Sequence, residues 1–344
     1  MKAEALRGAS LSAEAIDGAV LAQTLVARND HHRAVLVKGR ILSQDDWPVV
    51  AGTGIEELHV VRLEPGDVHE DEAARELAEL VAGPGIVRHE PVESQVRLSA
   101  AVNGIFHVDV VRLQALNSVE DVSVFTLFDG QLVSKGKTVA GVKVTPFVVP
   151  AARLREAARV IDRKDVVRVM AFKPMRVGIL VRERLDPAQR AKFQKSIEIK
   201  VGWFGSAISE IRYVADEVTA VETALHEVLL DADLLLTAGA NATDPLDPTL
   251  IALEHAGAKM EKRGAPAHPG SAVWLAYMED KAIFGVAACG MFSKATVLDL
   301  ILPRLFTGAR VSAADFNGLG HGGLLSKDMA FRFPAYGELN GSDG

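Results

Sequence analysis

Short apolar runs separated by turn residues dominate the first half of the chain. Apolar or β-rich runs cover residues 34–37, 58–63, 108–113 and 122–128. Turn dipeptides such as Asp129-Gly130 and Lys135-Gly136 follow at close spacing, which is typical of β-hairpins. The pattern predicts a strand-rich region, built as a small hairpin barrel or sandwich with a few helices.

One helix is clearly indicated within this region. Asp67 and Glu70 have the spacing of a capping box, and an apolar stripe continues from there to Val81. Gly83 and Pro84 then end the pattern. We therefore expect a helix that begins at Asp67, and an Ala- and Arg-rich stretch predicts another over residues 151–162.

Beyond about residue 170, strand patterns alternate with helical patterns. Expected strands begin near residues 176, 208, 234, 273 and 282, and expected helices begin near residues 187, 216, 247 and 293. Strands that alternate with helices in this way predict a mainly parallel sheet with helices on both faces. The fold class is thus α/β, with a three-layer α/β/α domain over residues 171–310. A strand-rich α+β region over residues 1–170 precedes it, and a C-terminal tail over residues 311–344 follows.

Composition narrows the classes of function. The 344 residues suit two domains, and the net charge of −7 argues against a nucleic-acid-binding surface. No apolar stretch is long enough to cross a membrane, and no signal peptide is recognisable, so we expect a soluble, cytoplasmic protein. Cys289 is the sole cysteine, which excludes an internal disulfide and a cysteine-built metal site.

Two loops have the position of a ligand site, because ligands of open α/β sheets lie beyond the carboxyl ends of the strands. The first loop follows the strand at residue 234 and consists mostly of small residues. Its candidate ligand contacts are Thr237, Gly239, Ala240 and Asn241. Asp244 and Asp247 are candidate catalytic residues and Mg²⁺ ligands, although an aspartate before Pro248 is equally typical of a helix cap.

The second loop follows the strand at residue 282. Gly290, Ser293 and Lys294 are its candidate ligand contacts. Ser293 could bond a phosphate or cap the next helix, and Lys294 could pair with a phosphate or extend into solvent. We expect Cys289, at the small-residue end of this strand, to be packed and unreactive.

An ordered set of motifs in residues 176–308 resembles the molybdenum-cofactor biosynthesis domain of molybdopterin adenylyltransferases and molybdopterin molybdenumtransferases. The matching positions, in order, are Asp216, Thr237, Gly239, Asp247, Pro269-Gly270 and the loop 285–294. The resemblance implies molybdopterin as the ligand and adds Gly270 and Ser271 to the binding residues.

The sequence departs from the family pattern at several ligand-contacting positions. Ala240 replaces the second glycine of a Gly-Gly pair, and Ser271 replaces a basic residue. Residues 288–291 lack the Pro-Gly-Asn-Pro turn, and residues 182–185 replace a Gly-Asp-Glu-Leu segment. These changes favour ligand binding over the chemistry of the family.

The leading hypothesis is a molybdopterin-binding protein that acts in cofactor biosynthesis, insertion or delivery, with or without full catalytic activity. A Mg²⁺-dependent nucleotide pyrophosphatase or nucleotidyltransferase of the same domain type is the alternative. We also expect a homo-oligomer, with Trp203, Phe204 and Phe306 as exposed contact residues, and a molybdoenzyme as a possible client.

Overall fold

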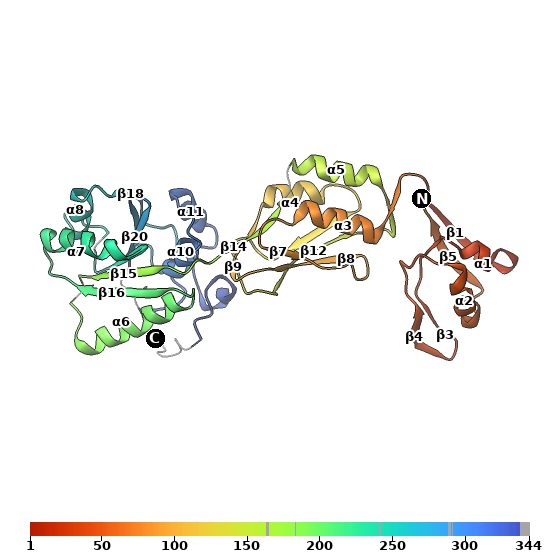
Figure 1. Cartoon of the computed structure of the whole chain (residues 1–344), viewed down its shortest axis with the longest axis horizontal. Coiled ribbons are helices and arrows are strands. Elements are labelled where there is room, and N and C mark those ends of the chain that lie inside the picture. Colours follow the sequence, from red (N-terminus) through yellow and green to blue (C-terminus); the bar gives the residue numbers. More distant parts are fainter. Residues whose placement is uncertain (163–164, 183, 241, 288–289, 291, 338–344) are drawn as a thin grey trace. The chain divides into compact units, whose positions relative to one another are not determined.

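The computed structural model describes residues 1–337 apart from 163–164, 183, 241, 288–289 and 291 (Figure 1). The chain forms two compact units. Unit 1 comprises residues 1–102, 106–129 and 133–169, and unit 2 comprises residues 103–105, 130–132 and everything from residue 170 onward.

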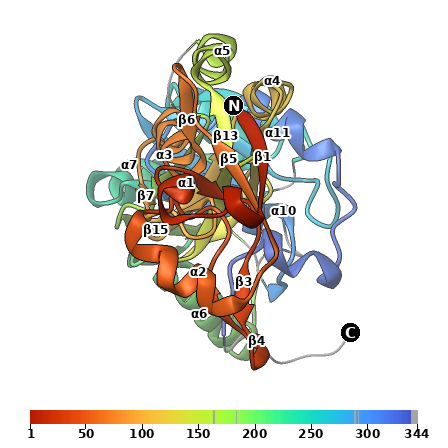
Figure 2. The same cartoon turned by 90° about the vertical axis from the view of Figure 1, so that its right-hand side faces the viewer.

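The first part of unit 1 is a small antiparallel sheet with short helices. The sheet contains β1 (Lys2–Arg7), β5 (Glu57–Arg62) and β2 (Val20–Leu21). β3 (Leu25–Ala27) and β4 (Asp30–Leu36) form a hairpin that α2 (Trp47–Thr53) contacts (Figure 2). Residues of these elements and of α1 (Ala13–Ile16) share one apolar core.

The second part of unit 1 is an antiparallel sheet packed against helices. Its strand order is β10 (Val122–Thr126), β12 (Thr138–Val144), β8 (Gln95–Ala100) and β7 (Ile86–Arg88). Three helices contribute to the core on this sheet: α3 (Glu70–Val81), α4 (Val110–Asn117) and α5 (Ala151–Ile161). In the same unit, β6 (Asp67–His69) pairs with β13 (Val148–Pro150). A separate sheet, whose residues are divided between the two units, consists of β11 (Leu132–Val133), β9 (Gly104–Val108) and β14 (Val167–Ala171).

Two local predictions for unit 1 are wrong. Most of the strand expected over residues 108–113 is the start of α4, because the Asp109 carboxylate accepts a hydrogen bond from the Arg112 backbone N–H (3.0 Å) and caps a helix there. α3 begins at Glu70 instead of Asp67, and its N-cap is His69. Asp67 lies in β6 and accepts a hydrogen bond from the Glu64 backbone N–H (2.9 Å).

Unit 2 contains one six-stranded mixed sheet. Its order is β16 (Ala207–Tyr213), β15 (Arg176–Val181), β17 (Leu234–Ala238), β20 (Lys281–Val286), β19 (Trp274–Met278) and β18 (Lys259–Arg263). The first four strands are parallel, whereas β19 and β18 add antiparallel pairs. The expected strands are thus found, and β18 is an additional edge strand that the apolar pattern did not indicate, since it carries several charged residues.

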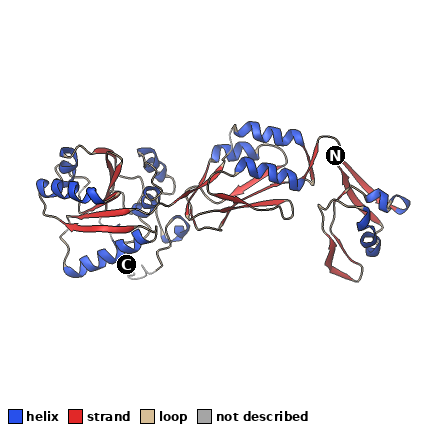
Figure 3. Ribbon diagram, in the orientation of Figure 1, coloured by secondary structure: helices blue, strands red, loops and turns tan. Residues whose placement is uncertain are grey.

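Helices cover both faces of this sheet (Figure 3). α6 (Pro187–Gly202) and α10 (Val297–Leu305) pack with the strand residues of one face, and α7 (Val218–Asp231) and α8 (Pro248–His255) pack with those of the other. Along β17, Leu234 and Leu236 belong to the first core and Leu235 to the second, as the alternation of side chains in a strand requires.

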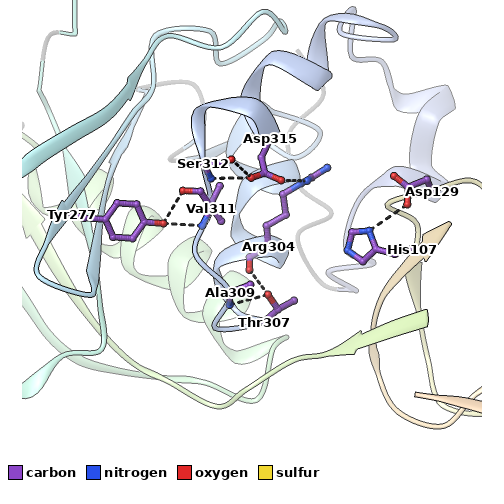
Figure 4. Close-up of polar contacts among 9 residues, drawn as sticks. All are labelled: His107, Asp129, Tyr277, Arg304, Thr307, Ala309, Val311, Ser312 and Asp315. Atoms are coloured by element: carbon purple, nitrogen blue, oxygen red, sulfur yellow. Dashed lines mark hydrogen bonds and ion pairs between the residues drawn. The ribbon is translucent and has the colours of Figure 1, made fainter. Parts of the chain in front are cut away.

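The segment after residue 310, expected as a tail, contributes buried residues from Val311 to Phe333 to the core of unit 2. It contains α11 (Ala313–Asn317), η3 (Gly318–Gly320) and η4 (Lys327–Arg332). Phe316 and Leu319 are buried in the same core as α6 and α10. The Tyr277 hydroxyl, at 2.9 Å from both atoms, donates to the Val311 carbonyl and accepts from the Val311 N–H (Figure 4).

Two of the three aromatic residues expected at an oligomer contact are buried. Phe204 and Phe306 are 4% and 0% exposed, and their rings stack with centroids 4.4 Å apart. Their predicted exposure is wrong, because both rings fill the core beneath α6 and α10. Self-association stays a prediction that must depend on other residues.

No helix in the described part of the chain is long and apolar enough to span a bilayer.

A substitution of Phe316 tests whether the segment after residue 310 belongs to the folded core. Phe316→Ala should lower the free energy of unfolding by about 3–5 kcal/mol, because it leaves a cavity where a fully buried ring was. Leu324→Ala is the matched control, since Leu324 is 82% exposed and should change stability by less than about 0.5 kcal/mol. Urea denaturation of the full chain measures both, and equal effects would contradict the assignment.

Asp315 gives a pH-dependent prediction in the same segment. Burial by itself would raise the pKa of Asp315, but hydrogen bonds from the Ser312 backbone N–H and hydroxyl, together with the Arg304 guanidinium (2.8 Å), hold this pKa below its ordinary value (Figure 4). A carboxylate whose pKa is lower in the folded state stabilises the fold at neutral pH, and this contribution is lost as the pH falls through the folded-state pKa.

Asp315→Asn should therefore destabilise the protein by about 1 kcal/mol at pH 7, and the difference from wild type should shrink as the pH falls below the ordinary pKa of an aspartate. Denaturation midpoints from pH 7 down to the acid limit of the fold measure the effect, with the exposed Asp280→Asn as control. A difference that persists undiminished at low pH would show that the charge of Asp315 is irrelevant.

Candidate functional site

The parallel strands of unit 2 end at one edge of the sheet. Val181 of β15 is opposite Tyr213 of β16 on one side and Ala238 of β17 on the other, and Ala238 is in turn opposite Val286 of β20. The loops that follow these four strands therefore leave the sheet side by side. Both loops identified in the sequence lie at this carboxyl edge.

Arg182, directly after β15, contacts the segments that follow β16 and β17. Its guanidinium forms ion pairs with the carboxylates of Asp216 and Asp247. It also donates to the Gly239 carbonyl (2.7 Å) and to the Thr249 hydroxyl (3.2 Å). The arginine side chain is only 10% exposed. One cation thus holds together the segments that follow β15, β16 and β17.

Asp247 has a structural role in this arrangement. It is 2% exposed, and besides its ion pair with Arg182 it accepts a hydrogen bond from the Thr249 backbone N–H (2.8 Å), which makes it the N-cap of α8 as its position before Pro248 indicates. Asp244 is exposed and its carboxylate accepts from the Leu246 backbone N–H (2.9 Å). The predicted helix cap is confirmed, whereas metal binding and catalysis by the two aspartates stay predictions.

Asp216 does not cap α7, contrary to expectation. Glu217 is the N-cap, and the Asp216 carboxylate turns to Arg182 instead. The partner of Asp216 is thus a nearly buried guanidinium, and the start of α7 has no side-chain cap.

Glycines shape two of the motif segments. Gly239 has a φ of +91°, which a side chain would strain. Gly270 has a φ of +101°, and a β-carbon there would lie 3.0 Å from the Val297 backbone nitrogen. The neighbouring Pro269 carbonyl accepts from that same Val297 N–H (3.1 Å), so the Pro-Gly segment lies against the start of α10. Ser271 is exposed beside it.

α10 begins at Val297, four residues later than expected. The capping alternative for Ser293 is wrong, because Thr296 is the N-cap and pairs with Asp299 in a capping box. Ser293 is exposed and Lys294 is half-buried, and Gly290 is buried with its N–H bonded to the Ala287 carbonyl (2.8 Å).

A fully buried ion pair lies under this loop. Lys200 of α6 and Asp299 of α10 are both 0% exposed and form a salt bridge. The Lys200 ammonium also donates to the Ser293 carbonyl (2.9 Å), while Asp299 accepts from the backbone N–H and the hydroxyl of Thr296 (2.9 Å each). The Lys200 ammonium lies 5.0 Å from the ring centroid of Tyr336, whose pKa is raised well above its ordinary value by burial and by the nearby Asp299.

The other residues that the sequence predicts as ligand contacts differ in burial and in hydrogen bonding. Thr237 is buried, and its hydroxyl has no hydrogen-bond partner among the described residues. Ala240 is half-buried and packs beside the core of α7 and α8. Asn241 and Cys289 fall outside the described residues. Across the part of the chain that is described, no group of three or more His, Cys, Asp or Glu side chains is arranged to hold a metal ion.

Arg182 and Lys200 were not among the sequence candidates. Arg182 is visible in the sequence as a departure from the Gly-Asp-Glu-Leu pattern, at the end of an apolar strand where charge is unusual. Lys200 lies three residues after Ile197 and seven after Phe193, a spacing that places it on the apolar face of α6.

Comparisons with known proteins give limited information. No protein-family model matches the sequence, and no curated protein matches it. One similar solved structure is a molybdopterin biosynthesis protein from Pyrococcus horikosii, at 13% identity over 70% of this chain and 79% of that chain, with a TM-score of 0.31. Another is a molybdenum cofactor biosynthesis protein B, at 14% identity over 35% and 86% of the two chains, with a TM-score of 0.26.

A third similar structure is a molybdenum cofactor biosynthesis protein from Pyrococcus furiosus, at 13% identity, covering 89% of this chain and 64% of that chain with a TM-score of 0.26. Likenesses this weak establish neither a family nor a function. Any assignment therefore has to rest on the residues of this chain.

The buried pair under the second loop provides a stability test. Lys200→Met should lower the free energy of unfolding by about 3–5 kcal/mol, because Asp299 is then buried without its counter-charge. Lys195→Met, on the same helix but exposed, should cost less than about 0.5 kcal/mol. Guanidinium chloride denaturation of the two variants measures the difference, and similar midpoints would mean that the pair contributes nothing.

Proposed function

We propose that unit 2 binds molybdopterin at the carboxyl edge of its sheet and acts in molybdenum-cofactor biosynthesis, insertion or delivery. The observation that carries the proposal is the convergence of the motif segments. The strand pairing brings the loops after β17 and β20 to one edge, and the Pro269-Gly270 segment is hydrogen-bonded to the start of the helix that follows the second loop. Segments that are separate in the sequence thus form one surface, in the order that the resemblance requires.

The chemistry of this edge suits an anionic, ring-bearing ligand. Small residues at Gly239 and Ala240 leave the backbone accessible, and Lys294 supplies a cation on the facing loop. Loops at helix starts favour bound anions, because backbone N–H groups and the helix dipole point toward them. Both features support binding of the phosphate group and the pterin ring at the same edge.

Binding without catalysis is the form of the proposal that the contacts favour. Asp247 is committed to the Arg182 guanidinium and to the cap of α8, and Asp244 to the backbone of its own turn. Both carboxylate oxygens of the buried Asp247 are engaged in this way, so a metal ligand or general base there would compete with Arg182 and the helix cap. Delivery to a molybdoenzyme client and assembly into a homo-oligomer belong to the same proposal.

Calorimetric titration of molybdopterin into the full chain tests this function. Lys294→Ala should weaken binding by roughly ten- to a hundredfold, since a charge-assisted contact contributes about 1.5–3 kcal/mol. Lys195→Ala removes an exposed lysine of α6 and should leave the affinity unchanged. Ala240→Trp should reduce binding further by filling the space beside Gly239.

The alternative activity is separated in a parallel titration with ATP and Mg²⁺. Release of AMP or pyrophosphate would identify a nucleotide pyrophosphatase or nucleotidyltransferase instead of a binding protein. If the wild type binds no molybdopterin, or if Lys294→Ala and Ala240→Trp bind it as the wild type does, the proposed function or its site is wrong.

A further inference from the structure

We propose that the guanidinium of Arg182 acts as a built-in cation at the ligand edge of unit 2, in the place of a divalent metal ion. Its bearing on ligand binding rests on the function proposed above, that unit 2 binds molybdopterin at this edge, and the consequence is that this binding needs no Mg²⁺. The cation site itself can be tested without any organic ligand.

The first argument is the set of atoms around the guanidinium. Two carboxylates (Asp216 and Asp247), the carbonyl of Gly239 and the hydroxyl of Thr249 all accept from it. Oxygens of these types are the ligands that hard divalent cations take in proteins. They come from three separate segments of the chain, and here the cation that they surround is a side chain.

The second argument is that backbone hydrogen bonds fix the position of Arg182. The Arg182 N–H donates to the Ala238 carbonyl (2.9 Å), and the adjacent Val181 carbonyl accepts from the Val214 N–H (3.0 Å). The side chain therefore starts from a fixed point between three strand ends. A guanidinium with several donors in one plane can satisfy acceptors on different sides at once, whereas a lysine ammonium presents a single point charge.

The third argument concerns competition with a metal. Asp247 is 2% exposed and Arg182 10%, so a metal ion bound by Asp247 would lie beside a nearly buried positive charge. Expelling the guanidinium would separate it from both counter-charges, which is costly for a buried ion. Arg182 consequently excludes a divalent ion from the position where the sequence predicted Mg²⁺ at Asp247.

An arginine in this position supports a different chemistry from that of a metal ion. The guanidinium compensates one of the two carboxylate charges around it, so an anionic ligand that approaches the Gly239 loop meets a net charge of −1 instead of −2. Unlike a metal ion, it holds no water whose pKa it could lower. The edge is thus equipped to hold a phosphate-bearing ligand and not to hydrolyse one.

The test uses Mn²⁺ as the probe, titrated into the full chain and followed by the electron paramagnetic resonance signal of the free ion. The wild type should show only weak surface binding. Arg182→Ala should gain one site that binds Mn²⁺ at least tenfold more tightly, because Asp216 and Asp247 lose their counter-charge. Arg182→Ala combined with Asp247→Asn should lose that site again.

Two further variants serve as controls. Arg176→Ala removes an arginine from the opposite end of β15, where it pairs with Asp231 at 3.6 Å, and should gain no site. Arg182→Lys keeps the charge and should also gain none. Should Arg182→Ala fail to fold, as judged by circular dichroism, Arg182→Gln removes the charge while retaining a hydrogen-bond donor.

Two results would overturn the proposal: a tight Mn²⁺ site in the wild type that Asp216→Asn or Asp247→Asn removes, or a folded Arg182→Ala or Arg182→Gln that gains no site. Titration of molybdopterin into wild type with EDTA separates this proposal from the proposed function. Binding that requires Mg²⁺ contradicts the role of Arg182 only, whereas no binding under either condition contradicts the proposed function and leaves the Mn²⁺ result to decide on Arg182.

Discussion

A positive charge that is removed from water has to be neutralised where it lies, and unit 2 meets this requirement at two places. Arg182 is enclosed by two carboxylates, a carbonyl and a hydroxyl, and Lys200 by a carboxylate and a carbonyl. Because each set of partners comes from separate segments, neutralising the charge also fixes the loops. The geometry of the candidate site is therefore a consequence of charge compensation as much as of apolar packing.

The two charges act on different loops. Arg182 joins the segments after β15, β16 and β17, and Lys200 joins α6 to the segment before α10. Between them the strands provide the common frame, since parallel pairing brings their carboxyl ends to one side.

The sequence was informative where one local pattern decides the outcome. The strand expected from residue 176 is β15, and the aspartate before Pro248 caps α8 as its position indicates. The antiparallel edge strand β18 was missed because charged residues interrupt its pattern, and the helix at Val110 was missed because β-branched residues dominate its start. The convergence of the two loops followed from the rule for parallel sheets.

The contacts of Arg182 could not be predicted in the same manner. They join residues that are 34 and 65 positions apart, and whether a carboxylate caps a helix or binds a distant guanidinium depends on the tertiary structure. Asp216 shows this directly, because its local sequence indicates a helix cap and its actual partner is Arg182.

Lys200 has a consequence for the covalent reactivity of the protein. Its amine has no exposed surface, and its protons are engaged with Asp299 and the Ser293 carbonyl. An acylating reagent needs both access to the nitrogen and its lone pair, and neither is offered while the loop is closed over it. Modification of this lysine therefore requires local opening of the structure around it, so its labelling would be slower than that of an exposed lysine in proportion to the population of the open state.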